Sequence, residues 1–488
     1  MARGNWPVEH LLRRAGFGAS ADDLIRFEDA SVSVAVDYLV EYDRQPDDVD
    51  SKIGQAAYVG ITTGNGPFAP YTNIEHARQR WLFRMVHSQR PLQEKMALFW
   101  HNHFATAYSK LAGVVSGVQA TKMLALKRGE LPGPQGQIEL FRQFGMGSFQ
   151  TLLFEVARDP AMIVWLDGRT NFRARPQENF AREIMELFTF GVGNYTESDV
   201  YTAARVFTGW NLRLATPGQR NDDPNTYYEF FYNPNQHDIN SKGFTFAIYP
   251  NGSGTIPARP ASEGMQDGID LIVALARHPE TARRLARKLW GFFVSEIHAP
   301  EPAFVEAVSR EYLLNNTEIR PVIRYILRSP WINDRSRWYT RYAWPVEFVV
   351  RSIREIGWNG LSIDTARTPL TNMGQQLFEP PDVAGWSLGP EWFSTGAMLA
   401  RMNFASQLAA NQRFNLSRDA AVARRTPEDL LGFFMNRLSP APYDSAPYNE
   451  LLSYLRTGVT WPLSDANLTA KSAGLAKLLV GSSEYQFV

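Results

Sequence analysis

Two histidines one residue apart form the segment of the sequence with the richest chemistry. His101 and His103 are two of only eight histidines, and they lie in the run Phe-Trp-His-Asn-His-Phe over residues 99–104. Imidazole nitrogens bind divalent metal ions and exchange protons near neutral pH. On a regular α-helix, residues two apart point about 200° apart, so both rings can bind one ion only where the helix is distorted. If the helix stays regular, one histidine faces a site and the other packs among aromatic residues.

A second cluster of polar residues lies on a predicted helix over residues 178–190. Asn179, Glu183 and Glu186 fall within about 60° of one another on a helical wheel, opposite an apolar stripe. Two interpretations of this face stay open. It is solvated, with i,i+4 ion pairs worth about 0.2–0.5 kcal/mol each, or it is turned to an interior site in which Glu183 and Glu186 bind a metal ion or act as a general base.

A third candidate is the pair His237 and Asp238, which ends a polar loop beginning at residue 233. A histidine and a carboxylate on a loop held by a rigid scaffold fit metal binding or acid–base chemistry. Neighbouring residues rarely bind the same ion, so one of the two would be a ligand and the other would act from outside the ligand shell. The alternative is a turn in which Asp238 accepts hydrogen bonds from backbone amides.

The leading hypothesis from these clusters is a metal-dependent hydrolase in which a carboxylate takes a proton from a metal-bound water. The metal would be zinc, magnesium, manganese or iron, and Arg182 would stabilise developing negative charge. No nucleotide cofactor is expected, since no dinucleotide fingerprint or phosphate loop occurs. The predicted metal ligands are His101, His103, Glu183 and His237, and the predicted catalytic residues are Asn179, Arg182, Glu186 and Asp238.

Two other functions stay open beside the hydrolase. The same histidines and carboxylates could hold iron for oxygen chemistry, as some helical bundles do. Alternatively, the chain is a non-catalytic binding or assembly protein whose aromatic residues contact a carbohydrate or a protein. Serine hydrolases with a Gly-x-Ser-x-Gly elbow and His-Glu-x-x-His zinc enzymes are disfavoured, because neither motif occurs.

Composition narrows the classes of partner. The 488 residues include 50 Lys and Arg against 50 Asp and Glu, so no net charge draws the chain to nucleic acid. Cysteine is absent, which leaves histidines and carboxylates as the strong metal ligands. No apolar run reaches the ~20 residues of a membrane helix. No signal peptide is recognised at the start, so we expect a cytoplasmic protein, or a periplasmic or secreted one if the start is trimmed.

Apolar residues recur at helical spacing along most of the chain, which predicts a mainly α fold, a large multi-helix orthogonal assembly. Alternating residues over 227–249 predict a small β-hairpin-like insertion. We expect a main body over residues 1–340 with an irregular insertion at about 211–262, and a helical C-terminal portion over 341–488 packed on the same body. The predicted helices cover residues 7–15, 21–27, 31–42, 74–104 with a restart at Pro91, 152–164, 178–190, 197–208, 265–277, 279–294, 302–314 and 346–356.

Eight phrases stand out along the chain, at residues 10–18, 99–104, 178–193, 207–210, 237–238, 281–290, 380–386 and 482–486. In their order they resemble the bacterial domain of unknown function 1800 family, over nearly the whole length. The resemblance implies that the His-Asn-His, Asn-x-x-x-Glu-x-x-Glu and His-Asp phrases belong to one pattern and converge in space, and it implies no particular activity.

Overall fold

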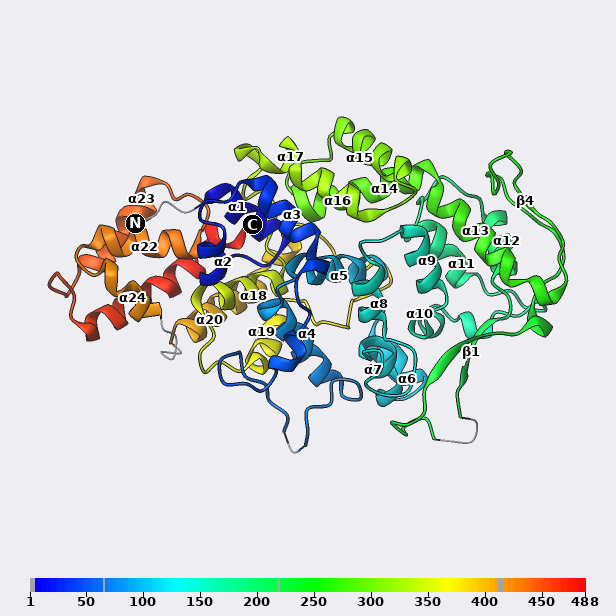
Figure 1. Cartoon of the computed structure of the whole chain (residues 1–488), viewed down its shortest axis with the longest axis horizontal. Coiled ribbons are helices and arrows are strands. Elements are labelled where there is room, and N and C mark those ends of the chain that lie inside the picture. Colours follow the sequence, from blue (N-terminus) through cyan, green and yellow to red (C-terminus); the bar gives the residue numbers. More distant parts are fainter. Residues whose placement is uncertain (1–4, 65, 217–219, 411–415) are drawn as a thin grey trace.

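Helices make up most of the computed structural model, which describes residues 5–64, 66–216, 220–410 and 416–488. The expected mainly α fold is confirmed. In Figure 1 the molecule is elongated, with α22 to α24 at one end, the strands at the other and α5 between them. The first half contains α1 (Trp6–Ala15), α2 (Ala21–Arg26), α3 (Val32–Val40), α4 (Ile74–His87), α5 (Pro91–His103), α6 (Tyr108–Val114), α7 (Gly117–Ala125), α8 (Gln137–Phe144), α9 (Phe149–Ala157), α10 (Pro160–Trp165), α11 (Glu178–Glu186) and α12 (Glu197–Val206).

The second half continues with helices after a short β segment. No helix in the described ranges is long and apolar enough to cross a membrane. The helices are α13 (Met265–Arg277), α14 (Pro279–Leu289), α15 (Pro302–Leu314), α16 (Ile319–Arg328), α17 (Pro330–Asn333), α18 (Pro345–Ile356), α19 (Arg367–Asn372), α20 (Thr395–Ala410), α21 (Leu416–Asp419), α22 (Pro427–Leu438), α23 (Ser445–Arg456) and α24 (Asp465–Val480).

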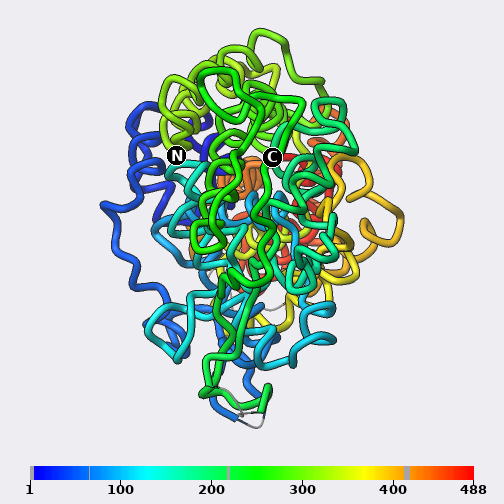
Figure 2. The backbone as a smooth tube through the Cα atoms, turned by 90° about the vertical axis from the view of Figure 1, so that its right-hand side faces the viewer, coloured from blue at the N-terminus to red at the C-terminus, as the bar shows by residue number. Residues whose placement is uncertain are grey.

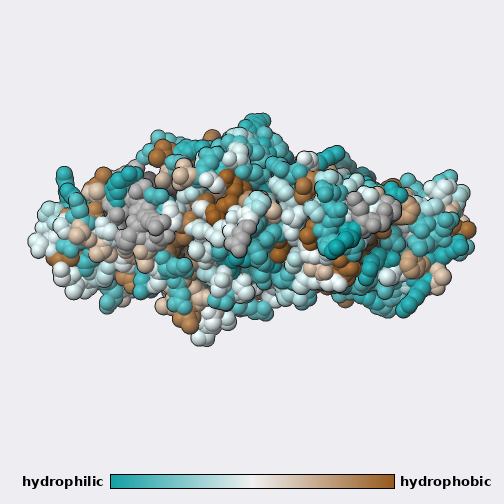
Figure 3. Space-filling view, turned by 90° about the horizontal axis from the view of Figure 1, so that it is seen from below, coloured by the Kyte–Doolittle hydropathy of each residue, from teal (hydrophilic) through white to brown (hydrophobic). Residues whose placement is uncertain are grey.

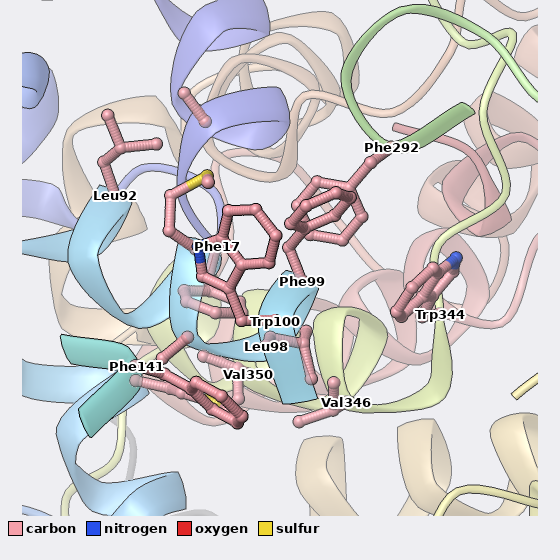
Figure 4. Close-up of a cluster of buried hydrophobic side chains, with 14 of the residues drawn as sticks. Phe17, Leu92, Leu98, Phe99, Trp100, Phe141, Phe292, Trp344, Val346 and Val350 are labelled. Atoms are coloured by element: carbon pink, nitrogen blue, oxygen red, sulfur yellow. The ribbon is translucent and has the colours of Figure 1, made fainter. Parts of the chain in front are cut away.

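Helix α5 lies in the centre of the hydrophobic core. The predicted restart at Pro91 is confirmed, because α4 ends at His87 and Pro91 occupies the first turn of α5. Almost every residue of α5 is buried. Figure 4 shows Phe99 and Trp100 of this helix among side chains from α8 and α18, from the loop after α1 and from the segment after α14. A helix enclosed on all sides holds its polar residues in fixed positions.

Several predicted helices differ from the structure, and the one expected over 178–190 ends at Glu186. The single helix expected over 152–164 is two helices, since the Asp159 side chain accepts a hydrogen bond from Met162 N and Pro160 begins α10. In the helix expected over 279–294, the α-helical part ends at Leu289 and a π-helical turn, Trp290–Val294, follows it. Helices α6, α7, α8, α16 and α17 were not predicted, and α19 to α24 were expected only as parts of a helical C-terminal portion.

The β insertion exists, but its strands pair differently from the prediction. Strand β2 (Tyr228–Tyr232) pairs with β1 (Trp210–Leu214) and not with residues 243–249. The Trp210 ring packs edge-on against Phe230 at 5.4 Å, a diagonal contact across the two strands. Two further short strands, β3 (Lys242–Gly243) and β4 (Thr255–Ile256), form a separate pair. Figure 2 shows the β1–β2 hairpin extending away from the helices.

The proposed boundary between residues 340 and 341 stays a prediction. Buried charges connect the segments on its two sides: Glu347 of α18 accepts hydrogen bonds from Lys95 of α5 and, at 2.8 Å, from Arg341. The outer surface is mixed in character, since Figure 3 shows hydrophobic residues scattered in small groups among polar ones on the face it draws.

Candidate functional site

The His-Asn-His segment ends α5 on a regular helix, so its three side chains point to three different parts of the chain. His101 packs edge-on against Trp81 at 5.3 Å and lies beside Phe378 and Trp386. Its Nε2 atom accepts a hydrogen bond from the backbone N–H of Phe378 at 3.3 Å. Burial lowers the pKa of His101 to about 3. His101 is therefore a neutral structural residue that holds the segment around Phe378.

Asn102 holds a second segment. Its Oδ1 atom accepts a hydrogen bond from the backbone N–H of Trp386 at 2.7 Å, and its Nδ2 atom donates to the carbonyl of the same residue at 3.4 Å. Gly385 has φ +88°, and a Cβ atom there would lie 2.4 Å from the Asn102 carbonyl oxygen. The turn before Trp386 can approach the end of α5 only because residue 385 is glycine.

His103 points to the loop that follows α11. Its Nε2 atom lies 3.1 Å from the carbonyl oxygen of Phe188, and its Nδ1 atom lies 2.9 Å from Nζ of Lys288 on α14. A carbonyl only accepts, so Nε2 carries the proton and Nδ1 accepts from the lysine. Burial, together with the charges of Lys288 and Arg284, lowers the pKa of His103 well below its ordinary value. The ring is neutral and orients the lysine.

Lys288 lies in an unusual environment for a lysine. Within the described part of the chain, no carboxylate comes within 4.0 Å of its ammonium, and His103 is its hydrogen-bond partner. Burial, and secondarily the charge of Arg284, lowers the pKa of Lys288 to about 7. Part of the side chain still reaches solvent. At neutral pH this amine is therefore partly unprotonated.

Arg284 lies one turn before Lys288 on α14 and has few partners. Its Nη2 atom donates to the carbonyl of Leu187 at 3.4 Å, and its buried Nε atom has no hydrogen-bond partner among the described residues. Burial lowers the pKa of Arg284, and the charge of Glu186 opposes that effect. A cation with unused donors, close to a neutral amine, can stabilise negative charge on another molecule.

Glu186 is a predicted catalytic residue whose charge acts on Arg284. Its Oε2 atom accepts a hydrogen bond from the hydroxyl of Tyr195 at 2.5 Å. Burial and this bond raise the pKa of Tyr195 to about 12, so the phenol stays protonated. We call His103, Lys288, Arg284, Glu186 and Tyr195 the Lys288 cluster.

The remaining predicted residues of α11 lie elsewhere on its polar face. Arg182 pairs with Glu197 through two exposed hydrogen bonds of 2.7 and 2.9 Å. This pair fits the interpretation of a solvated face. Asn179 donates to the carboxylate of Asp167 at 3.0 Å. The carboxylate of Glu183 has no hydrogen bond among the described residues, and burial and the charge of Glu186 raise its pKa.

His237 belongs to a separate buried polar group. Its Nδ1 atom donates to the carbonyl of Thr208 at 2.8 Å, and its Nε2 atom lies 3.2 Å from the carboxylate of Asp267 on α13. Asp267 also accepts from Lys242 and from Arg259, each at 2.6 Å. These bonds join the β segment to α13, so His237 acts as a structural connector.

Asp238 has a structural environment as well. Its carboxylate accepts hydrogen bonds of 2.8 and 3.2 Å from Arg205, and its backbone N–H donates to the hydroxyl of Thr208. The Asp238 carboxylate also accepts a hydrogen bond from the backbone N–H of Asn240. This is the alternative interpretation, a turn in which Asp238 accepts from backbone amides.

The predicted four-ligand group is not formed. Across the described ranges, no group of three or more His, Asp or Glu side chains is placed to hold a metal ion. The physical reason lies in the regular end of α5, which turns the two imidazoles apart, and in the partners of His103 and His237, which occupy both nitrogens of each ring. Of the predicted residues, His103 contacts Lys288, and the charge of Glu186 acts on Arg284.

Sequence reasoning missed Lys288 and Arg284, although both lie in the phrase at 281–290. One signal was available. Lys288 falls three residues after Leu285 and four before Phe292, both buried, so a lysine interrupts an apolar helical stripe. A charged residue at a core position is an indication of a special role.

Comparison with known proteins adds a family and no activity. A family model described as "Protein of unknown function (DUF1800)" matches residues 10–487. No curated protein matches the chain. No solved structure matches it either.

Proposed function

We propose that this chain, which belongs to the DUF1800 family, is a hydrolytic enzyme whose acid–base group is Lys288. The observation that carries the proposal is the contact between Lys288 and the neutral ring of His103, with no carboxylate beside the lysine in the described structure. A lysine whose pKa lies near the working pH is suited to proton transfer.

The geometry supports a defined role for each group. An unprotonated amine has two N–H groups and one lone pair, and donation to Nδ1 of His103 leaves the lone pair free for a water proton. His103 keeps its own orientation through the bond to Phe188. Arg284 supplies positive charge where a carbonyl oxygen would become negative as water adds.

An ester probe tests this role. With p-nitrophenyl acetate, kcat/KM of the wild-type protein should rise through pH 7 and then level off, because only the unprotonated amine accepts the proton. Lys288→Met should remove this rise. Lys477→Met changes an exposed lysine on α24 and serves as the matched control. An unchanged pH profile in Lys288→Met would count against the proposal.

A metal-dependent hydrolase is the second candidate, and one observation favours it. The charge of Glu186 contributes to the raised pKa of Glu183, so a divalent cation between the two carboxylates would relieve their repulsion. In that case metal analysis of the purified protein should give about one ion per chain, and Glu183→Gln should abolish metal binding. Protein without bound metal after dialysis against each of zinc, magnesium, manganese and iron would remove this candidate.

A further inference from the structure

Two cavities meet at Trp358, far along the chain from the Lys288 cluster. One has a volume of about 210 Å³ and the other about 430 Å³. Ser20, Asp22 and Trp358 line both of them. We call the combined hollow the Trp358 groove. The elements that supply it, α2, α18 and α22, lie near one another in Figure 1. The larger cavity falls within the range of about 300–1,000 Å³ that is typical of small-ligand sites.

Aromatic side chains form one wall of the Trp358 groove. The indole of Trp358 is held by a hydrogen bond from Nε1 to the carbonyl of Ala57 at 2.9 Å and by edge-on contact with His87 at 4.6 Å. His87 in turn contacts Tyr58 edge-on at 5.1 Å. Tyr58 and Tyr38 line the smaller cavity with Trp358. The rings are therefore fixed in position before any ligand arrives, which lowers the entropy cost of binding.

Hydrogen-bonding groups of both signs line the rest of the groove. Within the described ranges, no hydrogen bond occupies the side chains of Asp22, Asn359 or Arg437, all of which line the larger cavity. Asp419 also lines the larger cavity. A carboxylate accepts, a guanidinium donates and an amide does both. Because both acidic and basic side chains line the larger cavity, a neutral polar ligand suits it.

We propose that the Trp358 groove binds a neutral carbohydrate, with sugar units on both sides of Trp358. The C–H faces of a sugar ring pack against aromatic rings, and its hydroxyl groups both donate and accept. Asp22 and Arg437 then bind hydroxyl groups of the same chain of sugars. The groove shares no residue with the Lys288 cluster, so this binding does not depend on the proposed hydrolytic activity.

Binding of defined oligosaccharides to the full chain tests the proposal. The probes are cellohexaose, laminarihexaose, maltohexaose and xylohexaose at millimolar concentration, followed by calorimetry. At least one should bind, and Trp358→Ala should weaken it by about tenfold or more. Trp358→Phe keeps a ring and should lose less affinity. Asp22→Asn should also weaken binding. Trp331→Ala changes a partly buried tryptophan outside the groove and should bind like the wild type.

Several results would overturn the proposal. One is that none of the four hexasaccharides binds the folded wild-type protein. Another is equal affinity in the wild type, Trp358→Phe and Asp22→Asn, which would place any binding elsewhere. Tighter binding of hexagalacturonate than of every neutral probe would show that the cations select an acidic ligand. Thermal melting establishes whether each variant is folded. If Trp358→Ala does not fold, Asp22→Asn still tests the proposal.

Discussion

Lys288 donates a hydrogen bond to Nδ1 of His103 across 2.9 Å, and no carboxylate balances its charge within the described structure. Burying an unpaired ammonium costs free energy, so the lysine loses its proton more easily than an exposed one. The neutral ring of His103 tolerates both protonation states of the amine. This contact joins α5 to α14 and gives the cluster its chemistry.

The pH dependence of stability should report this burial. The folded pKa of about 7 lies below the ordinary value of 10.5, so between these values the unfolded chain binds the proton and the folded chain does not. The Lys288 contribution to the free energy of unfolding therefore rises with pH over this window, by up to about 1.4 kcal/mol per pH unit. Urea unfolding from pH 7 to pH 10 should show this rise in the wild type and a smaller one in Lys288→Met. Equal slopes would contradict the assignment.

Gly385→Ala should destabilise the protein through its contact with α5. The residue has φ +88°, and an added Cβ would lie 2.4 Å from the Asn102 carbonyl oxygen, so strain and a clash act together. We expect a loss of about 2–4 kcal/mol in urea unfolding. Gly129→Ala is the control, because φ is +87° and no heavy atom of the described structure lies within 4 Å of the added Cβ. That variant should lose only the conformational part, about 1–2 kcal/mol. Equal losses in both would argue against the close approach.

Asp267→Asn should be among the most damaging substitutions in the β segment. Lys242 is buried and donates to Asp267, so the neutral amide leaves an ammonium without its counterion. The expected loss is about 3–5 kcal/mol in chemical unfolding. Burial raises the pKa of Asp267, but the bonds from His237 and Lys242 outweigh it and the pKa is lowered. The difference in the free energy of unfolding between the wild type and Asp267→Asn should therefore become smaller as the pH falls through the folded pKa of Asp267. Asp270→Asn, which changes a less buried carboxylate, should cost less.

Much of the helical architecture could be predicted from local patterns. Pro91 indicates a helix start, and the regular helix after it determines that His101 and His103 diverge. The ends of helices were harder, because the break at Asp159 depends on a side-chain cap inside an otherwise continuous apolar pattern. The pairing of β2 with β1 depends on packing around Trp210, which no alternation in the sequence shows.

The site could be predicted only in part, for a different reason. The partners of each candidate residue come from distant segments: His103 meets Lys288 across 185 positions, and His237 meets Asp267 across 30. Residue type and spacing identify groups that are capable of chemistry. They do not show whether a buried histidine uses its nitrogens for a metal ion or for a backbone carbonyl.

The most direct test of the central claim is the pKa of Lys288 itself. Reductive methylation with ¹³C-formaldehyde labels lysine amines, and the carbon chemical shift follows their protonation. The signal absent from Lys288→Met should titrate at about pH 7, the value expected from its burial beside His103. A signal that titrates near 10.5, as exposed lysines do, would falsify the acid–base role of this residue.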